Sequence, residues 1–171
     1  MFRKMIPERM AESTYTLDYE KEYANGIRGL IFDIDNTLVT HGAPADENAV
    51  RLFEELHRIG FKTLLLSNND EERVRPFAEA CGTPYLCDAH KPSKKAAEAA
   101  LKLLGTGKED TLLVGDQLLT DRLTASRYGI PCVTVRPISK KEPAQIVLKR
   151  WIEAPFIKAA RRREQKKKSA T

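Results

Sequence analysis

The stretch GLIFDIDNTL, residues 29–38, decides the expected fold. Its apolar run is short and unbroken, which is typical of a strand buried on both faces of a parallel sheet. Asp33 and Asp35 come at the end of this run, where open α/β sheets bind their ligands. The stretch therefore predicts a strand that delivers two carboxylates to a binding edge.

Short apolar runs and helical patterns alternate after this strand. Residues 46–59 carry Val50, Phe53 and Leu56 at the spacing of a helix with one buried face. The same patterns predict strands over 61–66, 84–86, 111–114 and 132–135, and helices over 70–80, 93–104 and 120–128. Strands joined by helices imply right-handed crossovers. We therefore predict an α/β, three-layer Rossmann-like fold, with a parallel sheet of about five strands and helices on both faces.

Polar side chains follow the other predicted strands. Ser-Asn-Asn occupies 67–69, Lys-Pro occupies 91–92, and the stretch GDQLLTD occupies 115–121. Crowded carboxylates repel one another, so a cation is expected among them, and oxygen ligands favour Mg²⁺. A cation beside a lysine and a serine hydroxyl suits a phosphate group, and a carboxylate can act as the nucleophile. The pattern predicts phosphoryl transfer.

These motifs resemble those of the haloacid-dehalogenase-like superfamily, and within it the YqeG-type phosphatases of class IIIA. The matching stretches are 33–38, 67–69 and 115–121, and the resemblance covers roughly 29–135. It implies a phosphoric monoester hydrolase that uses Mg²⁺ and forms an aspartyl phosphate. The YqeG-type proteins are similar to phosphatidylglycerophosphate phosphatases, so the implied substrate is a phosphorylated small molecule or a lipid headgroup.

The resemblance also implies catalytic and phosphate-binding roles. Asp33 would be the nucleophile, and Asp35 would protonate the leaving oxygen and later activate water. Lys91 would stabilise charge during catalysis. Ser67, Asn68 and Lys91 would hold the phosphoryl oxygens.

A metal site and its supports follow from the same resemblance. The carboxylates of Asp33 and Asp116 would bind the metal, and Asp35 would add its backbone carbonyl. Thr37 and Asn68 would support the loop. Asp121 would orient the lysine or a metal-bound water.

Each motif also has a structural interpretation that is compatible with catalysis. The two acids of the first motif could cap a turn, residues 67–69 could be an ordinary turn, and Lys-Pro at 91–92 could begin a helix. His41 and His90 lie near the motifs and are candidates for contact with substrate.

The intervals between the motifs leave no room for a cap domain. Residues 38–46 make only a short loop, and residues 69–91 hold one helix and one strand. An uncovered site admits a bulky substrate, such as a lipid headgroup at a membrane surface or a macromolecule. An oligomeric partner could also cover it.

Positive charge is concentrated at the C-terminus. The net charge is +5, and residues 158–171 contribute +6 of it because seven basic residues face one acid there. We expect an N-terminal extension over 1–26, a phosphatase domain over 27–157 that ends in a helix over 143–157, and a disordered basic tail over 158–171.

The basic tail leaves two functions open. It could attract the domain to an anionic membrane. It could instead dock a phosphatase-like binding module, with weak catalysis, on RNA or ribosomes. The number of cysteines is odd (Cys81, Cys87 and Cys132), and the sequence lacks a secretory signal. Both observations favour a cytoplasmic location, which would allow peripheral contact at the inner membrane surface.

Overall fold

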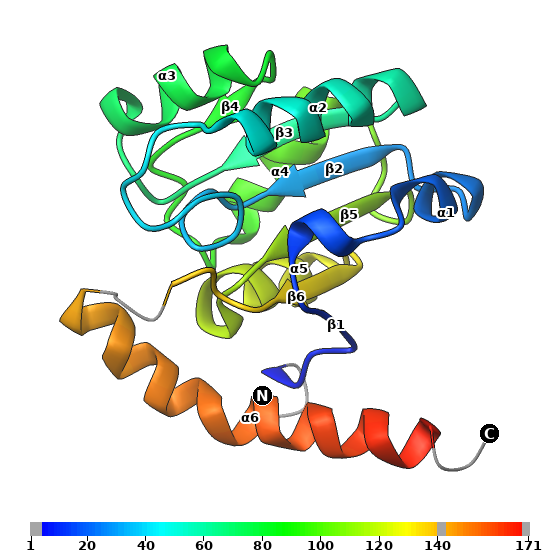
Figure 1. Cartoon of the computed structure of the whole chain (residues 1–171), viewed down its shortest axis with the longest axis vertical. Coiled ribbons are helices and arrows are strands. Elements are labelled where there is room, and N and C mark those ends of the chain that lie inside the picture. The colour runs from blue at the N-terminus through cyan, green and yellow to red at the C-terminus, as the bar shows by residue number, and fades with distance from the viewer. Residues whose placement is uncertain (1–4, 140–142, 169–171) are drawn as a thin grey trace.

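The computed structural model describes residues 5–139 and 143–168, which form a sheet between two layers of helices (Figure 1). In spatial order the strands are β1 Arg9–Ala11, β6 Cys132–Val135, β5 Thr111–Gly115, β2 Gly29–Phe32, β3 Lys62–Leu66 and β4 Tyr85–Leu86. Every strand pairing described is parallel. The predicted α/β class and layered arrangement are confirmed.

The helices alternate with the strands along most of the chain. In order they are η2 Thr14–Thr16, α1 Tyr19–Ala24, α2 Glu47–Ile59, α3 Glu71–Ala80, α4 Lys94–Leu104, the π-helical turn η3 Leu118–Arg122, α5 Leu123–Tyr128 and α6 Ala144–Lys168. Residues 38–46 and 69–91 hold no inserted domain, so the prediction that a cap domain is absent is confirmed for this described part of the chain.

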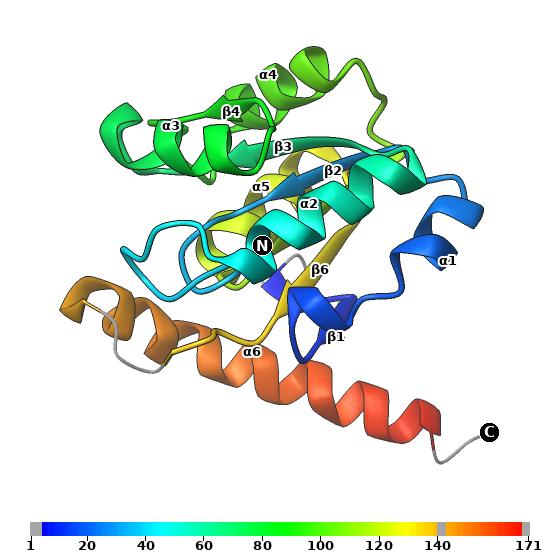
Figure 2. The same cartoon turned by 45° about the horizontal axis from the view of Figure 1, so that its top comes forward.

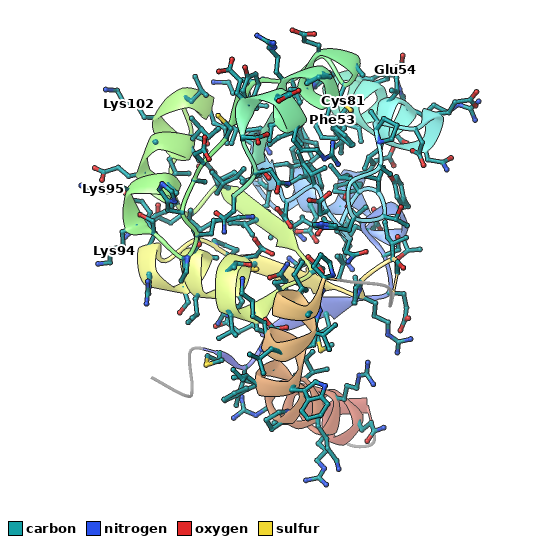
Figure 3. The ribbon with its side chains drawn as sticks, turned by 90° about the vertical axis from the view of Figure 1, so that its left-hand side faces the viewer. Phe53, Glu54, Cys81, Lys94, Lys95 and Lys102 are labelled. Carbon is teal, nitrogen blue, oxygen red and sulfur yellow. The ribbon has the colours of Figure 1, made fainter. Side chains whose placement is uncertain are left out.

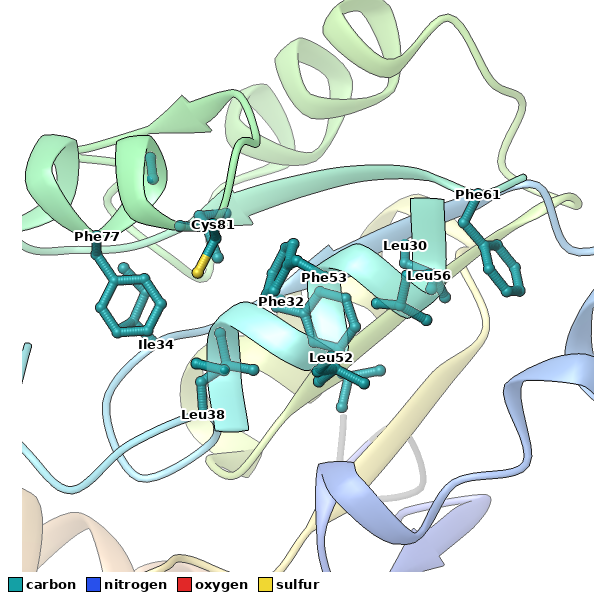
Figure 4. Close-up of a cluster of buried hydrophobic side chains, with 14 of the residues drawn as sticks. Leu30, Phe32, Ile34, Leu38, Leu52, Phe53, Leu56, Phe61, Phe77 and Cys81 are labelled. Atoms are coloured by element: carbon teal, nitrogen blue, oxygen red, sulfur yellow. The ribbon is translucent and has the colours of Figure 1, made fainter. Parts of the chain in front are cut away.

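Strand β2 is buried on both faces because its side chains alternate between two cores. Leu30 and Phe32 pack into the core beneath α2 and α3, where Phe32 lies 5.4 Å from Phe53 between ring centroids (Figure 4). Ile31 packs into the opposite core with α4. This two-sided burial fixes the register of β2 and with it the position of the carboxylates that follow.

Helix α4 shows how the outer layers meet solvent. Ala97 and Ala100 are fully buried against the sheet. Lys94, Lys95 and Lys102 project outward from the same helix (Figure 3). The lysines therefore belong to a solvated face.

The N-terminal extension contributes a sixth strand. Arg9–Ala11 forms β1, which pairs in parallel with β6 at the sheet edge, and Tyr19 of α1 is buried in the core beneath α2. Three residues without an apolar alternation give too weak a pattern to predict a strand. The segment 1–26 was expected only as an extension.

Helix α6 is longer than the sequence predicts. It runs along the β1 and β6 side of the domain (Figures 1 and 2) and passes through Pro155 without ending. Residues 158–168, expected to be disordered, continue this helix, whereas residues 169–171 lie outside the described residues. None of the helices in 5–139 and 143–168 is long and apolar enough to span a bilayer.

Candidate active site

The carboxyl ends of neighbouring strands bring the sequence motifs together. Asp33 follows β2, Ser67 follows β3 and Asp116 follows β5, and these strands are adjacent in the order β5-β2-β3. A pocket at this edge is lined by residues that follow β2, β3, β4 and β5 and by residues of α6, namely Asp33, Asp35, His41, Ser67, Asn68, Asn69, Lys91, Gln117, Thr120, Ile146 and Lys149. Five of the predicted residues therefore line one pocket, whereas Thr37, Asp116 and Asp121 are outside its lining.

Lys91 links two of the acids. Its Nζ lies 2.7 Å from Asp33 Oδ1 and 2.7 Å from Asp121 Oδ1, and all three side chains are at least nine-tenths buried. Burial would lower the pKa of Lys91, but the Asp121 and Asp33 carboxylates outweigh burial and raise that pKa above its ordinary value. The lysine is therefore a fixed positive charge beside Asp33.

Three carboxylates lie together here, and two of them, Asp33 and Asp121, contact Lys91. Oxygen atoms of Asp33, Asp116 and Asp121 lie within 4.8 Å of one another. Burial is the main cause that raises the pKa of Asp33 to about 7, with Lys91 opposing it. Burial likewise raises the pKa of Asp116 well above its ordinary range. Such buried acids are stabilised as carboxylates by a cation.

The local charge balance leaves room for a divalent cation. Among the described residues, Lys91 and Arg150 make the salt bridges to these three carboxylates. Two positive charges thus face three negative ones in a buried setting. An all-oxygen donor set of this kind fits Mg²⁺.

Asp35 faces a separate set of donors. Its carboxylate accepts hydrogen bonds from the Gly42 amide at 3.0 Å, Asn69 Nδ2 at 2.7 Å and Arg73 Nη2 at 3.0 Å. Burial would raise the pKa of Asp35, but these donors, the Gly42 amide first, lower it below its ordinary value. His41 Nδ1 lies 3.4 Å from the same carboxylate. Asp35 is therefore held ionised beside the pocket.

The second motif fastens the loop that carries Lys91. The Lys91 amide donates to Asn68 Oδ1 at 2.6 Å, and Asn68 Nδ2 donates to the Lys91 carbonyl at 3.3 Å. Ser67 Oγ accepts from the Asn69 amide at 3.1 Å. Asn68, predicted to support the loop and to bind phosphate, thus positions the backbone of Lys91, and its contact with phosphate stays a prediction.

The stretch 115–121 depends on a close approach within its own loop. A Cβ atom added at Gly115 would lie 2.5 Å from the Asp121 carboxyl group. Asp121 Oδ2 also accepts a hydrogen bond from the Gln117 amide at 3.1 Å. Thr37 Oγ1 donates to Asp116 Oδ1 at 3.3 Å, so Thr37 supports an acid as well as the loop. Glycine at 115 allows Asp121 to reach Lys91.

Helix α6 closes one side of the site. Arg150 forms an ion pair with the Asp116 carboxylate, and its Nη1 donates to the Asp116 carbonyl at 2.8 Å. Glu153 is fully buried and accepts from the Leu119 amide at 2.9 Å and from Arg150 Nη1 at 3.3 Å. Lys149 of the same helix lines the pocket. The C-terminal helix is thus part of the site.

Comparisons with known proteins agree with this geometry. A family model described as "haloacid dehalogenase-like hydrolase" matches residues 42–129. The Bacillus subtilis (strain 168) protein "Probable phosphatase YqeG" is 33% identical over 159 residues, which cover 92% of each chain. The chain belongs to the haloacid dehalogenase-like hydrolase family.

Two further comparisons give another relative in sequence and a solved structure with the same fold. "Phosphatidylglycerophosphate phosphatase 1, chloroplastic" of Chlamydomonas reinhardtii is 30% identical over 89% of this chain and 61% of that protein. The crystal structure of an uncharacterized protein from Listeria monocytogenes serotype 4b shares the fold, with a TM-score of 0.56 and 19% identity over 68% of this chain and 85% of that one. The predicted superfamily and the prediction of a phosphatase are confirmed.

Several functional candidates in this hydrolase were missed in the sequence. Arg73 lies on α3 beyond the second motif, and its contact with Asp35 spans 38 residues of chain. Arg150 and Glu153 reach the site from α6. Glu153 is the one acid between 143 and 163, and this isolated acid is the only sequence signal that could have marked the contact. His90 is outside the residues that line the pocket.

Proposed function

We propose that this phosphatase is Mg²⁺-dependent and hydrolyses a phosphomonoester through an aspartyl phosphate on Asp33. The observation that carries the proposal is the buried contact of Asp33 with Lys91, next to Asp116 and Asp121. Phosphoryl transfer needs positioning and charge neutralisation more than covalent assistance. This site supplies both.

The donor set supports a Mg²⁺ site built from this chain's oxygens. The carboxylates of Asp33 and Asp116 would hold the ion, together with the backbone carbonyl of Asp35. Bound there, Mg²⁺ would neutralise charge on the transferring phosphoryl group and favour the ionised form of Asp33.

The chain's own groups account for the first chemical step. A carboxylate oxygen of Asp33 attacks phosphorus, and the bond from phosphorus to the leaving oxygen breaks. Asp35 gives its proton to that oxygen as it departs. Lys91 and the Ser67 hydroxyl hold the non-bridging phosphoryl oxygens, and Asn68 keeps the lysine backbone in place.

In the hydrolysis of the intermediate, Asp35 acts as a general base instead of a general acid. Asp35 takes a proton from water, the water oxygen attacks phosphorus, and the bond from phosphorus to Asp33 breaks. Phosphate leaves and both acids return to their starting states. The lowered pKa of Asp35 keeps its carboxylate ionised, the form that can accept a proton, and requires that the proton for the first step be acquired before or with substrate binding.

A lipid phosphomonoester is the substrate class that we propose. Two relatives are named as phosphatidylglycerophosphate phosphatases, from Chlamydomonas reinhardtii and Arabidopsis thaliana. The lack of a cap domain in the described chain supports a substrate whose bulk stays outside the pocket. Fold alone does not assign a substrate, so the proposal rests on these two observations together. The alternative of a module that docks on RNA or ribosomes finds no support in the relatives.

Phosphate release tests the function. Wild type and Asp33→Asn are compared on an aryl phosphate and on phosphatidylglycerophosphate in mixed micelles, with Mg²⁺ and with a chelator. We expect Mg²⁺-dependent release from both substrates, a higher kcat/KM on the lipid, and no release by the variant. Release that persists with chelator or in Asp33→Asn contradicts the mechanism. Activity restricted to the aryl phosphate contradicts the lipid assignment.

A further inference from the structure

Exposed apolar side chains are concentrated on helix α6. Seven large hydrophobic side chains are exposed among the described residues, and four of them fall within six consecutive positions of this helix. They are Val147, Leu148, Trp151 and Ile152, with exposed fractions of 38%, 64%, 77% and 51%. We call these four residues the α6 outer face. Such a cluster on an otherwise polar surface marks an interaction site.

The contacts of α6 with the active site hold this face outward. Arg150 and Glu153 are bonded to Asp116 and Leu119, so their side of the helix is turned toward the domain. Residues 147, 148, 151 and 152 are spaced by one and four positions, which places them together on the opposite side of a helix. The apolar side chains cannot turn inward without breaking the contacts of Arg150.

The second half of the same helix is basic. Lys158, Arg161, Arg162 and Arg163 are exposed, and the sequence from 154 to 163 contains no acid. An apolar patch with a tryptophan, continued by a basic segment, matches the interface of an anionic bilayer, where lipid headgroups meet the acyl region. This charge complementarity favours a lipid surface over a second copy of the chain, which would bring two strongly basic helices together.

We propose that the α6 outer face docks the domain on an anionic lipid bilayer, with Lys158 and Arg161–Arg163 on the headgroups. This inference rests on the proposed lipid phosphatase function and adds the surface through which the enzyme would reach a lipid substrate. Ile146 and Lys149 of the same helix line the active-site pocket. Since a helix with its side chains is about 10 Å wide, docking brings the pocket mouth within about 10 Å of the bilayer. A phosphorylated headgroup could then enter while its acyl chains stay in the membrane.

The position of Trp151 makes a direct test possible, because it is the single tryptophan of the chain. The full-length protein is titrated with phosphatidylglycerol vesicles and with phosphatidylcholine vesicles, neither of which carries a phosphomonoester. We expect a blue shift of tryptophan emission and co-sedimentation with the anionic vesicles only, both weakened by salt. Brominated lipids in those vesicles should quench the emission.

A matched pair of variants distinguishes the loss of a docking contact from the general effect of making an exposed apolar side chain polar. Ile152 and Leu103 are equally exposed, at 51%, but Leu103 lies on α4, away from α6. We expect Ile152→Gln to weaken partitioning into anionic vesicles about tenfold and Leu103→Gln to leave it unchanged. Both variants should keep wild-type activity on the soluble aryl phosphate, which shows that they are folded.

The outcomes distinguish this inference from the proposed function. Unchanged emission with no co-sedimentation overturns the docking proposal, whatever the activity. A blue shift that depends on protein concentration without vesicles assigns the face to self-association and also overturns it. Vesicle binding by a protein that releases no phosphate from phosphatidylglycerophosphate retains the docking surface and rejects the proposed substrate.

Discussion

Arg150 on the C-terminal helix pairs with Asp116 at the end of β5, bonding both its carboxylate and its main-chain oxygen. The contact joins parts of the chain separated by 34 positions. It places a guanidinium on a carboxylate that we propose as a Mg²⁺ ligand. Arg150 and a bound Mg²⁺ would therefore compete for the same carboxylate oxygens.

Removal of Arg150 should strengthen metal binding. A charge-assisted hydrogen bond to a carboxylate contributes about 1.5 kcal/mol or more, so we expect Arg150→Ala to tighten Mg²⁺ binding about tenfold at pH 8. Isothermal titration with Mg²⁺ measures this without substrate. Arg51→Ala, at an exposed site on α2, is the control and should match wild type. Weaker binding in Arg150→Ala would mean that the arginine organises the metal site.

The stability of the metal-free protein should fall as pH rises. The pKa of Asp33 is about 7 when folded and near 3.8 when unfolded, so the folded state binds more protons between these values. The free energy of unfolding then decreases with pH across that window. We expect thermal unfolding in chelator to show a lower Tm at pH 8 than at pH 5. In Asp33→Asn the fall in Tm between pH 5 and pH 8 should be smaller. An equal fall in both proteins would argue against a raised pKa of Asp33 in the folded state.

Asp35→Asn should separate the two chemical steps. An aryl leaving group needs little protonation, so Asp33 can still be phosphorylated, whereas hydrolysis loses its general base. General acid–base catalysis contributes roughly 10²–10⁴-fold, and we expect steady-state turnover to fall by about that factor. Rapid-quench kinetics should reveal a burst of aryl alcohol followed by slow release of phosphate. A uniform slowing without a burst would place Asp35 in the first step alone.

Gly115→Ala should damage the site through Asp121. The added Cβ would meet the Asp121 carboxyl group at 2.5 Å, so the carboxylate must move away from Lys91. We expect kcat to fall at least about tenfold, since positioning a catalytic cation at the wrong distance weakens transition-state stabilisation. Gly107→Ala, where the new Cβ would meet only side-chain oxygens, the nearer at 3.2 Å, should retain wild-type kcat. Equal kcat values for Gly115→Ala and Gly107→Ala would show that the position of Asp121 does not affect catalysis.

Local patterns are sufficient to predict the central strands of the sheet and the edge at which the sequence motifs gather. The carboxylates of Asp33 and Asp35 follow strand β2 as predicted. The apolar run and the change to polar residues after it are both visible in the sequence. Helix α2 ends at Gly60, which has a φ of 111°, a backbone geometry that favours glycine. Such signals depend only on residues that are close together in the chain, so they can be recognised in the sequence.

The missed features depend on contacts between distant parts of the chain. Arg73 and Arg150 have the ordinary appearance of helix-surface cations, and only the packing of α3 and α6 beside the strand ends brings them to Asp35 and Asp116. The continuation of α6 beyond 157 was likewise hidden, because Pro155 and a basic composition suggested an end to the helix. The charge of that segment was evident, but its helical form was not.

Detection of phosphate on Asp33 tests the central claim most directly. The Asp35→Asn variant is mixed with a radiolabelled phosphomonoester and Mg²⁺, quenched in acid within the burst, and digested for peptide mass spectrometry. We predict a phosphoryl group on Asp33, no label in the Asp33→Asn and Asp35→Asn double variant, and no label when Mg²⁺ is chelated. Phosphate release by a protein that never carries label on Asp33 would contradict the mechanism.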